Sequence, residues 1–364
     1  MWWVILIIVL FVFVKLYNHF SHSFWVKQPV LYDAPLSIRS LSHWKKEYEL
    51  ITLTRQQKGI LKYKGDNVRT ISCSDISGEE HIIQELIKLH YIDPAKQRFA
   101  FSIDEWIGEH TYGIHRPSLV SLCGENGMMV SKSAFFKSNH MKYNIYSVDW
   151  LVVHTQRRRQ GVANQLIASH AHDVWANLGY TCPILFKREG VLSPVVPLVE
   201  YNAYMYSITG WKPYKPVKVT RITENNFELL REWDKLDIPH MVGYESIHMR
   251  ELIKQGRFII FLVNGSIHVF KNYSLFYNLD GTWRRVLFYI GSIYTELKMS
   301  LQWFKQMLIE CGEYDYLLLE NISHNYIVYD LLNSHKAITE TKMAYYMYNQ
   351  VVYPKPAKDV FICV

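Results

Sequence analysis

The clearest pattern in the chain is an apolar segment that runs into a basic turn and then into a helical repeat. Residues 148–154 are mostly apolar and predict a buried strand. Three consecutive arginines, 157–159, and a glycine follow, and apolar side chains then recur at helical spacing from Val162 to a stop near Gly179. The free N–H groups and positive dipole of a helix start would lie beside these arginines. The pattern therefore predicts an anion-binding loop.

Helices and short strands are expected before this loop. Polar residues 74–80 precede apolar positions from Ile82 to Leu89 that recur at helical spacing, and Ser102 is placed to cap a second helix because Glu105 stands three residues later. Strands are expected at residues 118–123, 127–135 and 143–153. Helices, an antiparallel meander, a loop and a further helix together predict one lobe.

The second half of the chain repeats this order without an anion loop. Helices are expected at residues 226–233, 248–255 and 296–311, and strands at 258–262, 266–273, 284–293 and 314–319. Residues 24–70 hold few periodic segments, which predicts an extended arm. Two lobes of the same order suggest an internal duplication, although no residue-level repeat is visible.

Composition narrows the class of protein. A chain of 364 residues with 49% hydrophobic residues can fill the cores of two lobes. The net charge of +7 is moderate and its basic residues are scattered apart from residues 157–159, so we expect no nucleic-acid partner. Five cysteines are widely spread without any Cys-x-x-Cys pair, which predicts reduced thiols and no metal site.

The first 17 residues form the most hydrophobic stretch of the chain. We expect them to be an uncleaved membrane anchor, with the rest of the protein on the cytosolic side. A signal peptide is disfavoured because no basic segment precedes the stretch and no small-residue cleavage site precedes Lys15. The remaining alternative is a buried N-terminal strand or helix.

Four segments carry a resemblance, one of them to a superfamily and three to a single family. The spacing Arg158-x-x-Gly161-x-Ala163 resembles the pyrophosphate loop of the GCN5-related acyltransferases, although an ordinary solvated basic turn can have the same spacing. Residues 149–154, DWLVVH, resemble the Asn-Phe-Leu-Cys-Val-His strand of protein N-myristoyltransferases. Residues 24–30, FWVKQPV, resemble that family's Phe-Trp-x-x-Gln-Pro-Val segment, and residues 190–194 more loosely resemble its Gly-Val-Val-Leu-Pro. All three stand in the family's order, so the resemblance covers nearly the whole chain beyond residue 20.

The resemblance implies an α/β fold of two tandem GCN5-related acyltransferase-like lobes that form one saddle-shaped sheet. The expected units are an anchor at 1–17, an arm over acyl-CoA at 18–70, an acyl-CoA lobe at 71–218 and a lobe for the peptide groove at 219–364. No permanent cofactor is expected, with myristoyl-CoA as a co-substrate. The residues implied to bind it are Phe24, Trp25, Trp150, Leu151, Val152, Val153, Arg158, Arg159, Gln160, Gly161, Val162 and Ala163.

The resemblance also implies how acyl transfer would proceed. The main-chain N–H groups of Trp150 and Leu151 would form the oxyanion hole, and the α-carboxyl group of Val364 would be the base. Sequence alone leaves open whether the apolar residues 359–364 enter a core or form an edge strand. Asp149 stands where the family has Asn, so its acidic group could bind or deprotonate the incoming amine.

Two departures bear on the acceptor. The family's Tyr-Thr-Ala-Gly turn is replaced by residues 187–190, KREG, and Gln160 and Gly161 replace two basic residues of its phosphate loop. Despite these departures, the resemblance implies transfer of a myristoyl group from acyl-CoA to the N-terminal glycine of proteins, and we expect a monomer attached to a membrane. The alternatives are a catalytically inactive lipid- or peptide-binding protein and an acyltransferase for another amine.

Overall fold

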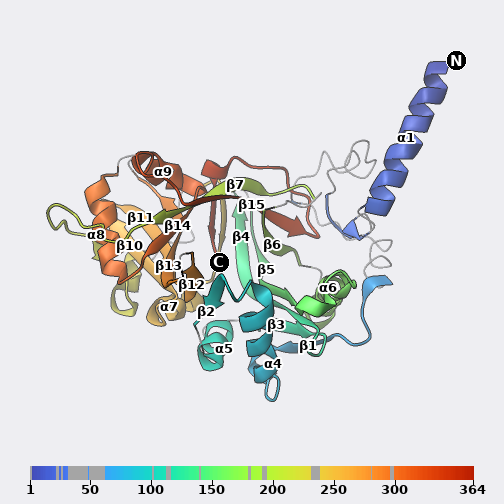
Figure 1. The fold of residues 1–364 in the computed structure, drawn as a ribbon, viewed down its shortest axis with the longest axis horizontal. Helices are drawn as coiled ribbons and strands as arrows, with labels where there is room; N and C mark the ends of the chain where they lie inside the picture. The colour runs from blue at the N-terminus through green and yellow to red at the C-terminus, as the bar shows by residue number, and fades with distance from the viewer. Residues whose placement is uncertain are drawn as a thin grey trace.

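The computed structural model describes residues 2–21, 24–25, 28–31, 48, 62–100, 102–111, 116–138, 141–178, 182–190, 195–230, 238–279, 281–295 and 299–364. These residues build one large mixed sheet with helices packed against it (Figure 1). The expected α/β class is confirmed. The predictions for residues 191–194 and for most of the arm lie outside the described residues.

The sheet runs through both halves of the chain in a single hydrogen-bonded path. Its strands are, in order across the sheet, β1 (Arg69–Ser72), β3 (Leu119–Leu122), β4 (Gly127–Ser138), β5 (Met141–Val153), β6 (Ile184–Glu189), β15 (Thr339–Tyr348), β7 (Val199–Ser207), β14 (Tyr316–Glu320), β13 (Trp283–Ile293), β11 (Ser266–Lys271), β10 (Phe258–Val263) and β8 (Thr220–Arg221). Four further strands lie off this path: β9 (His240–Gly243) pairs with β4 and β16 (Val360–Cys363), and β12 (Leu275–Asn278) pairs with β13 and β2 (Gln97–Phe99).

The order of the strands shows the expected duplication. The series β3-β4-β5-β6-β15 on one side of the path corresponds to β10-β11-β13-β14-β7 on the other. In each series two antiparallel strands lead to a helix and then a parallel strand: α6 (Val162–Leu178) joins β5 to β6, and α8 (Leu301–Cys311) joins β13 to β14. The helices α6 and α8 lie at opposite ends of the molecule (Figure 1).

The innermost strand of each series comes from the other half of the chain. Strand β7 belongs to the first half, by which we mean the lobe expected at 71–218, but it pairs with β14 and β15 of the second, the lobe expected at 219–364. Strand β15 belongs to the second half but pairs with β6 and β7 of the first. The two lobes therefore share a centre that neither half of the chain builds alone.

The remaining helices follow the sequence pattern, except that a 3₁₀ segment, Glu224–Leu230, lies at the start of the helix expected at 226–233, and that α8, expected at 296–311, starts at Leu301. They are α4 (Glu80–Glu85), the π-helix η3 (Leu86–Tyr91), α5 (Ile103–Thr111), α7 (Ser246–Lys254), α9 (Tyr326–Leu331), and the 3₁₀ segments η2 (Cys73–Asp75), η4 (Thr155–Arg157), η5 (Glu224–Leu230), η7 (Ser323–Asn325) and η8 (Ala357–Asp359). The cap at Ser102 is confirmed, since its hydroxyl accepts from Glu105 N–H at 3.1 Å. The helix expected after residues 74–80 is observed as α4 and η3; α4 starts at Glu80 without a side-chain cap, and Ser72 caps the short η2 before it.

The N-terminal residues form helix α1 (Trp2–Ser21), which extends away from the body of the molecule (Figure 1). Most side chains from Trp2 to Phe13 are exposed. Within the described residues, no helix is both long enough and apolar enough to cross a membrane. The membrane anchor expected at residues 1–17 stays a prediction.

The last strand lies in the core. Residues Val360 to Cys363 are buried, and Val364 is 7% exposed. Strand β16 runs parallel to β9, which pairs in turn with β4. The end of β16 is thereby brought beside the centre of the first lobe, so of the two readings left open, entry into a core is the one observed. All five cysteines lie in described segments, where they are buried and unpaired.

Candidate functional site

A β-bulge lies at the centre of the first lobe. Strands β4 and β5 pair regularly until Ser131 opposes Val148, and the next pair is Val130 with Trp150. Asp149 is therefore an extra residue without a partner in the ladder. Bulges of this kind bend a strand and redirect the side chain at that position, and they are frequent beside active sites. The bulge stands immediately before the predicted oxyanion residues Trp150 and Leu151.

Strands β5 and β6 separate just after this point. They pair only at Tyr146 and Ser147, whereas β6 pairs with β15 along its whole length. His154 N–H donates to the carbonyl oxygen of Asn126 at 2.9 Å, so by alternation Leu151 and Val153 point their main-chain groups away from β4. These groups face the gap between the strands, where no described strand pairs with them.

The corresponding gap in the second lobe is closed. A bulge at Ile290 matches the one at Asp149, because Val269 pairs with Gly291 and Phe270 pairs with Tyr289. Beyond it, the Asn325 amide donates to the carbonyl oxygens of Glu320 at 2.7 Å and Tyr289 at 3.4 Å. The Ser323 hydroxyl donates to the carbonyl oxygen of Ser292. The short segment η7 thus occupies the main-chain groups of the second gap.

The predicted anion loop has the backbone geometry of an anion site. Arg159 has φ 64° and Gly161 has φ 83°, and α6 begins directly afterwards. The first bond of the α6 ladder is Gln165 N–H to the carbonyl oxygen of Gly161 at 3.1 Å, so the preceding N–H groups have no acceptor within the helix. Arg157 and Arg159 are exposed and make no ion pair with the described residues. A turn with such free N–H groups at a helix start favours a phosphate.

Arg158 differs from its neighbours. Its guanidinium donates to the carbonyl oxygen of His90 at 2.5 Å and to that of Val153 at 3.4 Å. It therefore ties the loop to the end of η3 as well as adding charge. His154 accepts from Gln156 N–H at 3.2 Å and so orients the same loop.

A buried cluster of charges lies behind the bulge. Lys132 on β4 is fully buried, and its Nζ lies 2.6 Å from Asp149 Oδ2 and 3.0 Å from Glu109 Oε1 on α5. Burial opposes the charge of all three groups, but their mutual attraction outweighs it. The Lys132 pKa is held well above its usual range, the Glu109 pKa is lowered to about 2, and the Asp149 pKa is lowered further. Both carboxylates are therefore ionised and engaged.

Further basic side chains surround the two carboxylates. His110 Nε2 lies 3.3 Å from Asp149 Oδ2, while its Nδ1 contacts the carbonyl oxygen of Trp106 at 2.7 Å. Arg257, at the start of β10, reaches Glu109 at 3.5 Å and Glu105 at 3.0 Å. Because Arg257 belongs to the second half of the chain, the cluster also joins the two lobes.

Val364 is brought to the same cluster. In the register of β16, β9 and β4, Cys363 lies beside Gly243 and Gly243 beside Phe135, so Val364 lies level with Tyr244. The Tyr244 ring centroid is 5.0 Å from Lys132 Nζ. The main-chain oxygen of Val364 accepts a hydrogen bond from Lys271 Nζ at 3.0 Å. The structure thus gathers the predicted catalytic positions Asp149, Trp150, Leu151 and Val364 around one centre.

The segment that replaces the expected Tyr-Thr-Ala-Gly turn is engaged elsewhere. Lys187 Nζ lies 2.6 Å from Glu320 Oε1, and the Tyr201 hydroxyl donates to Glu320 Oε2 at 2.7 Å. The Glu320 side chain is 3% exposed and that of Lys187 21%, so this is a partly buried pair between β6 and β14. A Lys187 held this way supports the sheet, which limits what it can offer an acceptor.

The described residues of the arm pack beside the gap. Phe24 is buried, and the Trp25 ring stacks on Phe186 of β6 with centroids 5.7 Å apart. The carbonyl oxygen of the buried Gln28 side chain accepts from the Tyr348 hydroxyl at 2.6 Å. Phe24 and Trp25 are thus placed next to the strand that borders the opening. Val152 and Val162 are buried and Ala163 is half-buried, while Gln160 is exposed on the loop.

Sequence reasoning missed Lys132, Lys271 and Glu109. Lys132 and Lys271 are single charges within apolar strands, a pattern that an outward-facing residue also gives. Glu109 lies about two turns after the predicted helix start at Ser102, without any motif. One signal for a buried Lys132 was available: the residues on both sides of it in the strand are apolar or small.

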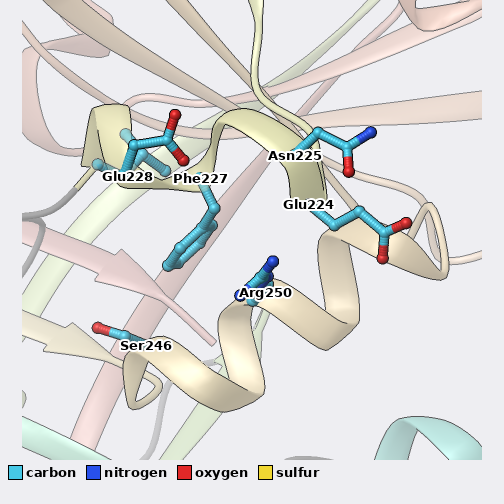
Figure 2. Close-up of a pocket in the computed structure, with 7 residues that line it drawn as sticks. Glu224, Asn225, Phe227, Glu228, Ser246 and Arg250 are labelled. Carbon is cyan, nitrogen blue, oxygen red and sulfur yellow. The ribbon is translucent and has the colours of Figure 1, made fainter.

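A surface pocket lies elsewhere, on the second lobe. It measures about 290 Å³ and is lined by Glu224, Asn225, Phe227, Glu228, Leu230, Ser246 and Arg250. Figure 2 shows Arg250 of α7 facing the residues of η5. No group of residues suited to a metal ion occurs in the described parts of the chain.

Comparisons with known proteins were made with both sequence and structure. No family model matches the sequence, and no curated protein matches it. Solved structures do match: Saccharomyces cerevisiae N-myristoyltransferase with bound myristoyl-CoA superposes with a TM-score of 0.68 at 11% identity, over 92% of this chain and 94% of that one. A second structure of that enzyme gives 0.69 at 11% identity, over 93% and 90%. The two proteins share a fold across nearly their whole lengths.

Proposed function

We propose that this chain, which has the fold of yeast N-myristoyltransferase, is an acyl-CoA-dependent N-acyltransferase that transfers a myristoyl group to the N-terminal glycine of proteins. The observation that carries the proposal is the open gap between β5 and β6. It lies between a bulge on one side and a helix start with free N–H groups on the other. A thioester whose phosphates bind at α6 would have its acyl end directed along β5.

The chemistry follows from that placement. Direct attack of an amine on a thioester needs donors for the developing oxyanion, and no covalent nucleophile. Leu151 N–H faces the gap by strand alternation, and Trp150 follows the bulge, where alternation is broken. These two N–H groups are our proposed oxyanion hole. The closed second gap supports a single acyl-CoA site in the first lobe.

The role expected for Asp149 changes. A carboxylate 2.6 Å from Lys132 and with a strongly lowered pKa is a poor base for an ammonium group. We assign it a positioning role: its ion pair fixes the bulge from which Trp150 and Leu151 follow. Val364 stays the predicted base through its α-carboxyl group. Extending the chain by a few residues after Val364 should then abolish transfer while acyl-CoA affinity is kept.

Attachment to a membrane is part of the proposal in a restricted form. The exposed apolar side chains of α1 fit the acyl boundary of a lipid surface. Co-sedimentation with phosphatidylcholine vesicles should pull down the full chain, whereas a chain lacking residues 1–21 should stay in the supernatant. Equal behaviour of the two would remove this role from α1.

The enzymatic proposal is tested with labelled myristoyl-CoA and two peptides that differ only in beginning with glycine or alanine. Transfer to the glycine peptide alone supports the full proposal, and transfer to both or to lysine side chains points to another amine. A protein that binds myristoyl-CoA without any transfer would instead be a lipid- or peptide-binding protein, a reading favoured by the changed residues 187–190.

A further inference from the structure

A buried histidine joins helix α6 to two strands of the first lobe. His170 is 0% exposed, and its ring lies between two serine hydroxyl groups. Its Nδ1 lies 2.8 Å from Ser121 Oγ on β3, and its Nε2 lies 2.7 Å from Ser131 Oγ on β4. Both ring nitrogens are therefore hydrogen-bonded, and the two bonds cross from the helix to the sheet.

The hydrogen bonds continue from Ser121 to a carboxylate near the surface. Thr70 Oγ1, on β1, lies 2.6 Å from Ser121 Oγ and donates to Asp173 Oδ2 at 2.7 Å. The Asp173 side chain is 19% exposed. Burial opposes its charge, but hydrogen bonds from His172 and Thr70 outweigh this effect and lower the pKa of Asp173. The series of bonds thus ends on an ionised carboxylate, which can only accept.

This carboxylate sets the direction of every bond in the series. The Thr70 proton goes to Asp173, so Thr70 Oγ1 accepts from the Ser121 hydroxyl. Because the Ser121 proton is used there, Ser121 Oγ accepts from His170 Nδ1–H. Burial lowers the pKa of His170 to about 4, so the ring is neutral and its Nε2 accepts from the Ser131 hydroxyl. His170 is therefore held in one tautomer, with its proton on Nδ1.

Ser131 is the residue of β4 that borders the bulge. It opposes Val148, the last regular partner on β5 before Asp149. The neighbouring Lys132 points to the other face of β4, where it pairs with Asp149. The bulge is thus held by Lys132 on one face of the sheet, and the strand beside it is held by His170 on the other.

Helix α6 connects this contact to the anion loop. His170 lies about two turns after Val162, the first residue of the helix. The same helix therefore has free N–H groups at its start and a hydrogen bond to the bulge strand in its middle. A ligand bound at the loop would be placed relative to the bulge through His170.

The second lobe lacks this polar contact. Its bulge lies between Val269 and Phe270, so Phe270 takes the place of Ser131. The Phe270 ring packs against Phe304 of α8, with centroids 6.2 Å apart. Apolar packing thus joins helix and bulge strand where the gap is closed, and directed hydrogen bonds join them where the gap is open.

We propose that His170 is a positioning residue for acyl transfer. It fixes α6 against the bulge strand, so that the thioester of an acyl-CoA bound at the loop meets the N–H groups of Trp150 and Leu151. This role rests on the proposed function. Reacting groups displaced by about 1 Å can lose about 100-fold in rate, so a contact remote from the chemistry can control it.

The test uses the full chain and four variants. His170→Leu removes both bonds at similar volume, whereas the amide of His170→Gln can still donate to Ser121 and accept from Ser131. Ser131→Ala removes only the bond to the bulge strand. Ser138→Ala is the matched control: Ser138 lies on the same strand and is 4% exposed, and its hydroxyl has no hydrogen-bond partner among the described residues.

Transfer of myristoyl to a glycine peptide gives kcat, and the stoichiometry of myristoyl-CoA binding counts the folded protein. His170→Leu and Ser131→Ala should lose about tenfold or more in kcat at unchanged myristoyl-CoA affinity. His170→Gln should recover most of kcat, and Ser138→Ala should behave as wild type. A merely structural histidine would lower the Tm of His170→Leu but leave kcat per folded molecule unchanged, and that result would overturn the role.

The tautomer of His170 is a second measurement that needs no activity. In ¹⁵N-labelled protein the ring should show a proton on Nδ1 and none on Nε2 between about pH 6 and about pH 8. A ring that exchanges between tautomers would show that the two serines do not hold it, which would overturn the role even if His170→Leu failed to fold. A wild-type chain that binds myristoyl-CoA but transfers nothing would overturn the proposed function and this role together, whereas equal transfer by wild type and His170→Leu would overturn this role alone.

Discussion

Lys132 Nζ lies 2.6 Å from Asp149 Oδ2. A cation from the middle of β4 is thus paired with the bulge residue of β5, which has no partner in the ladder of the two strands. The bulge is therefore held by an ion pair as well as by the register of the two strands. It also explains how an aspartate can stand where the resembled family has an asparagine: the extra charge is neutralised inside the protein rather than presented to a substrate.

Replacing Lys132 with Met should lower the free energy of unfolding by about 3–5 kcal/mol, because two buried carboxylates would lose their common partner. Urea unfolding measures the effect. Lys254→Met is the matched control, since Lys254 meets Glu224 at 3.8 Å on an exposed surface and such pairs contribute about 1 kcal/mol or less. Adding Asp149→Asn to Lys132→Met should recover part of the loss. Equal losses for the two methionine variants would contradict the buried pair.

Acid should weaken the fold through the same carboxylates. The Glu109 pKa falls from 4.5 to about 2 in the folded chain, and that of Asp149 is also lowered. Their contribution to stability is present above the unfolded pKa values near about 4, and it is lost as the pH falls through the folded values. For Glu109 the loss is about 3 kcal/mol. Urea midpoints at about pH 7, about pH 4 and about pH 3 should fall in that order, and Glu109→Gln should flatten the decline.

Arg159→Ala should weaken myristoyl-CoA binding about tenfold, the order expected for one charge-assisted contact to phosphate, and should reduce the dependence of binding on salt. Isothermal titration at low and high salt measures both. Lys215→Ala removes an equally exposed charge far from the loop and should change neither. Arg158→Ala should differ in kind, because it also frees the carbonyl oxygens of His90 and Val153 and so lowers stability. Unchanged affinity in Arg159→Ala would remove this arginine from the site.

Gly161→Ala tests the backbone of the anion loop. An added Cβ would meet no atom within 4 Å, so the cost comes from φ +83° alone and is about 1 kcal/mol of stability. Gly78→Ala is the matched control, with φ +89° and equally open space in a turn before α4. Both variants should lose similar stability by thermal unfolding, but only Gly161→Ala should weaken acyl-CoA binding. The same loss of affinity in both would mean that the loop geometry is not specific to the ligand.

The sequence predicted correctly those features that depend on interactions between neighbouring residues. The cap at Ser102 and the strands around the anion loop depend on neighbours within a few residues, and they were predicted close to their observed bounds. The helix expected over Ile82 to Leu89 is observed as well, as α4 and η3, although no side chain caps its start.

The centre of the site could not be predicted from neighbouring residues. The bulge at Asp149 exists only in the register between β4 and β5, which depends on pairing across the sheet. Lys132 and Lys271 are buried charged residues whose partners, carboxylates and aromatic rings, lie on other elements of the fold. The resemblance directed attention to Asp149 and Val364, and the structure supplied the lysine next to each.

The exchange of β7 and β15 between the lobes sets how this protein can be divided. A break among residues 209–219 would leave one fragment whose β6 lacks its outer neighbour and another whose β14 lacks its own. Each fragment alone would present an unpaired strand edge and should aggregate, but the two expressed together should rebuild the sheet by mutual insertion. The halves of this chain are therefore complementary parts rather than separable units, and either one would serve as the template on which the other folds.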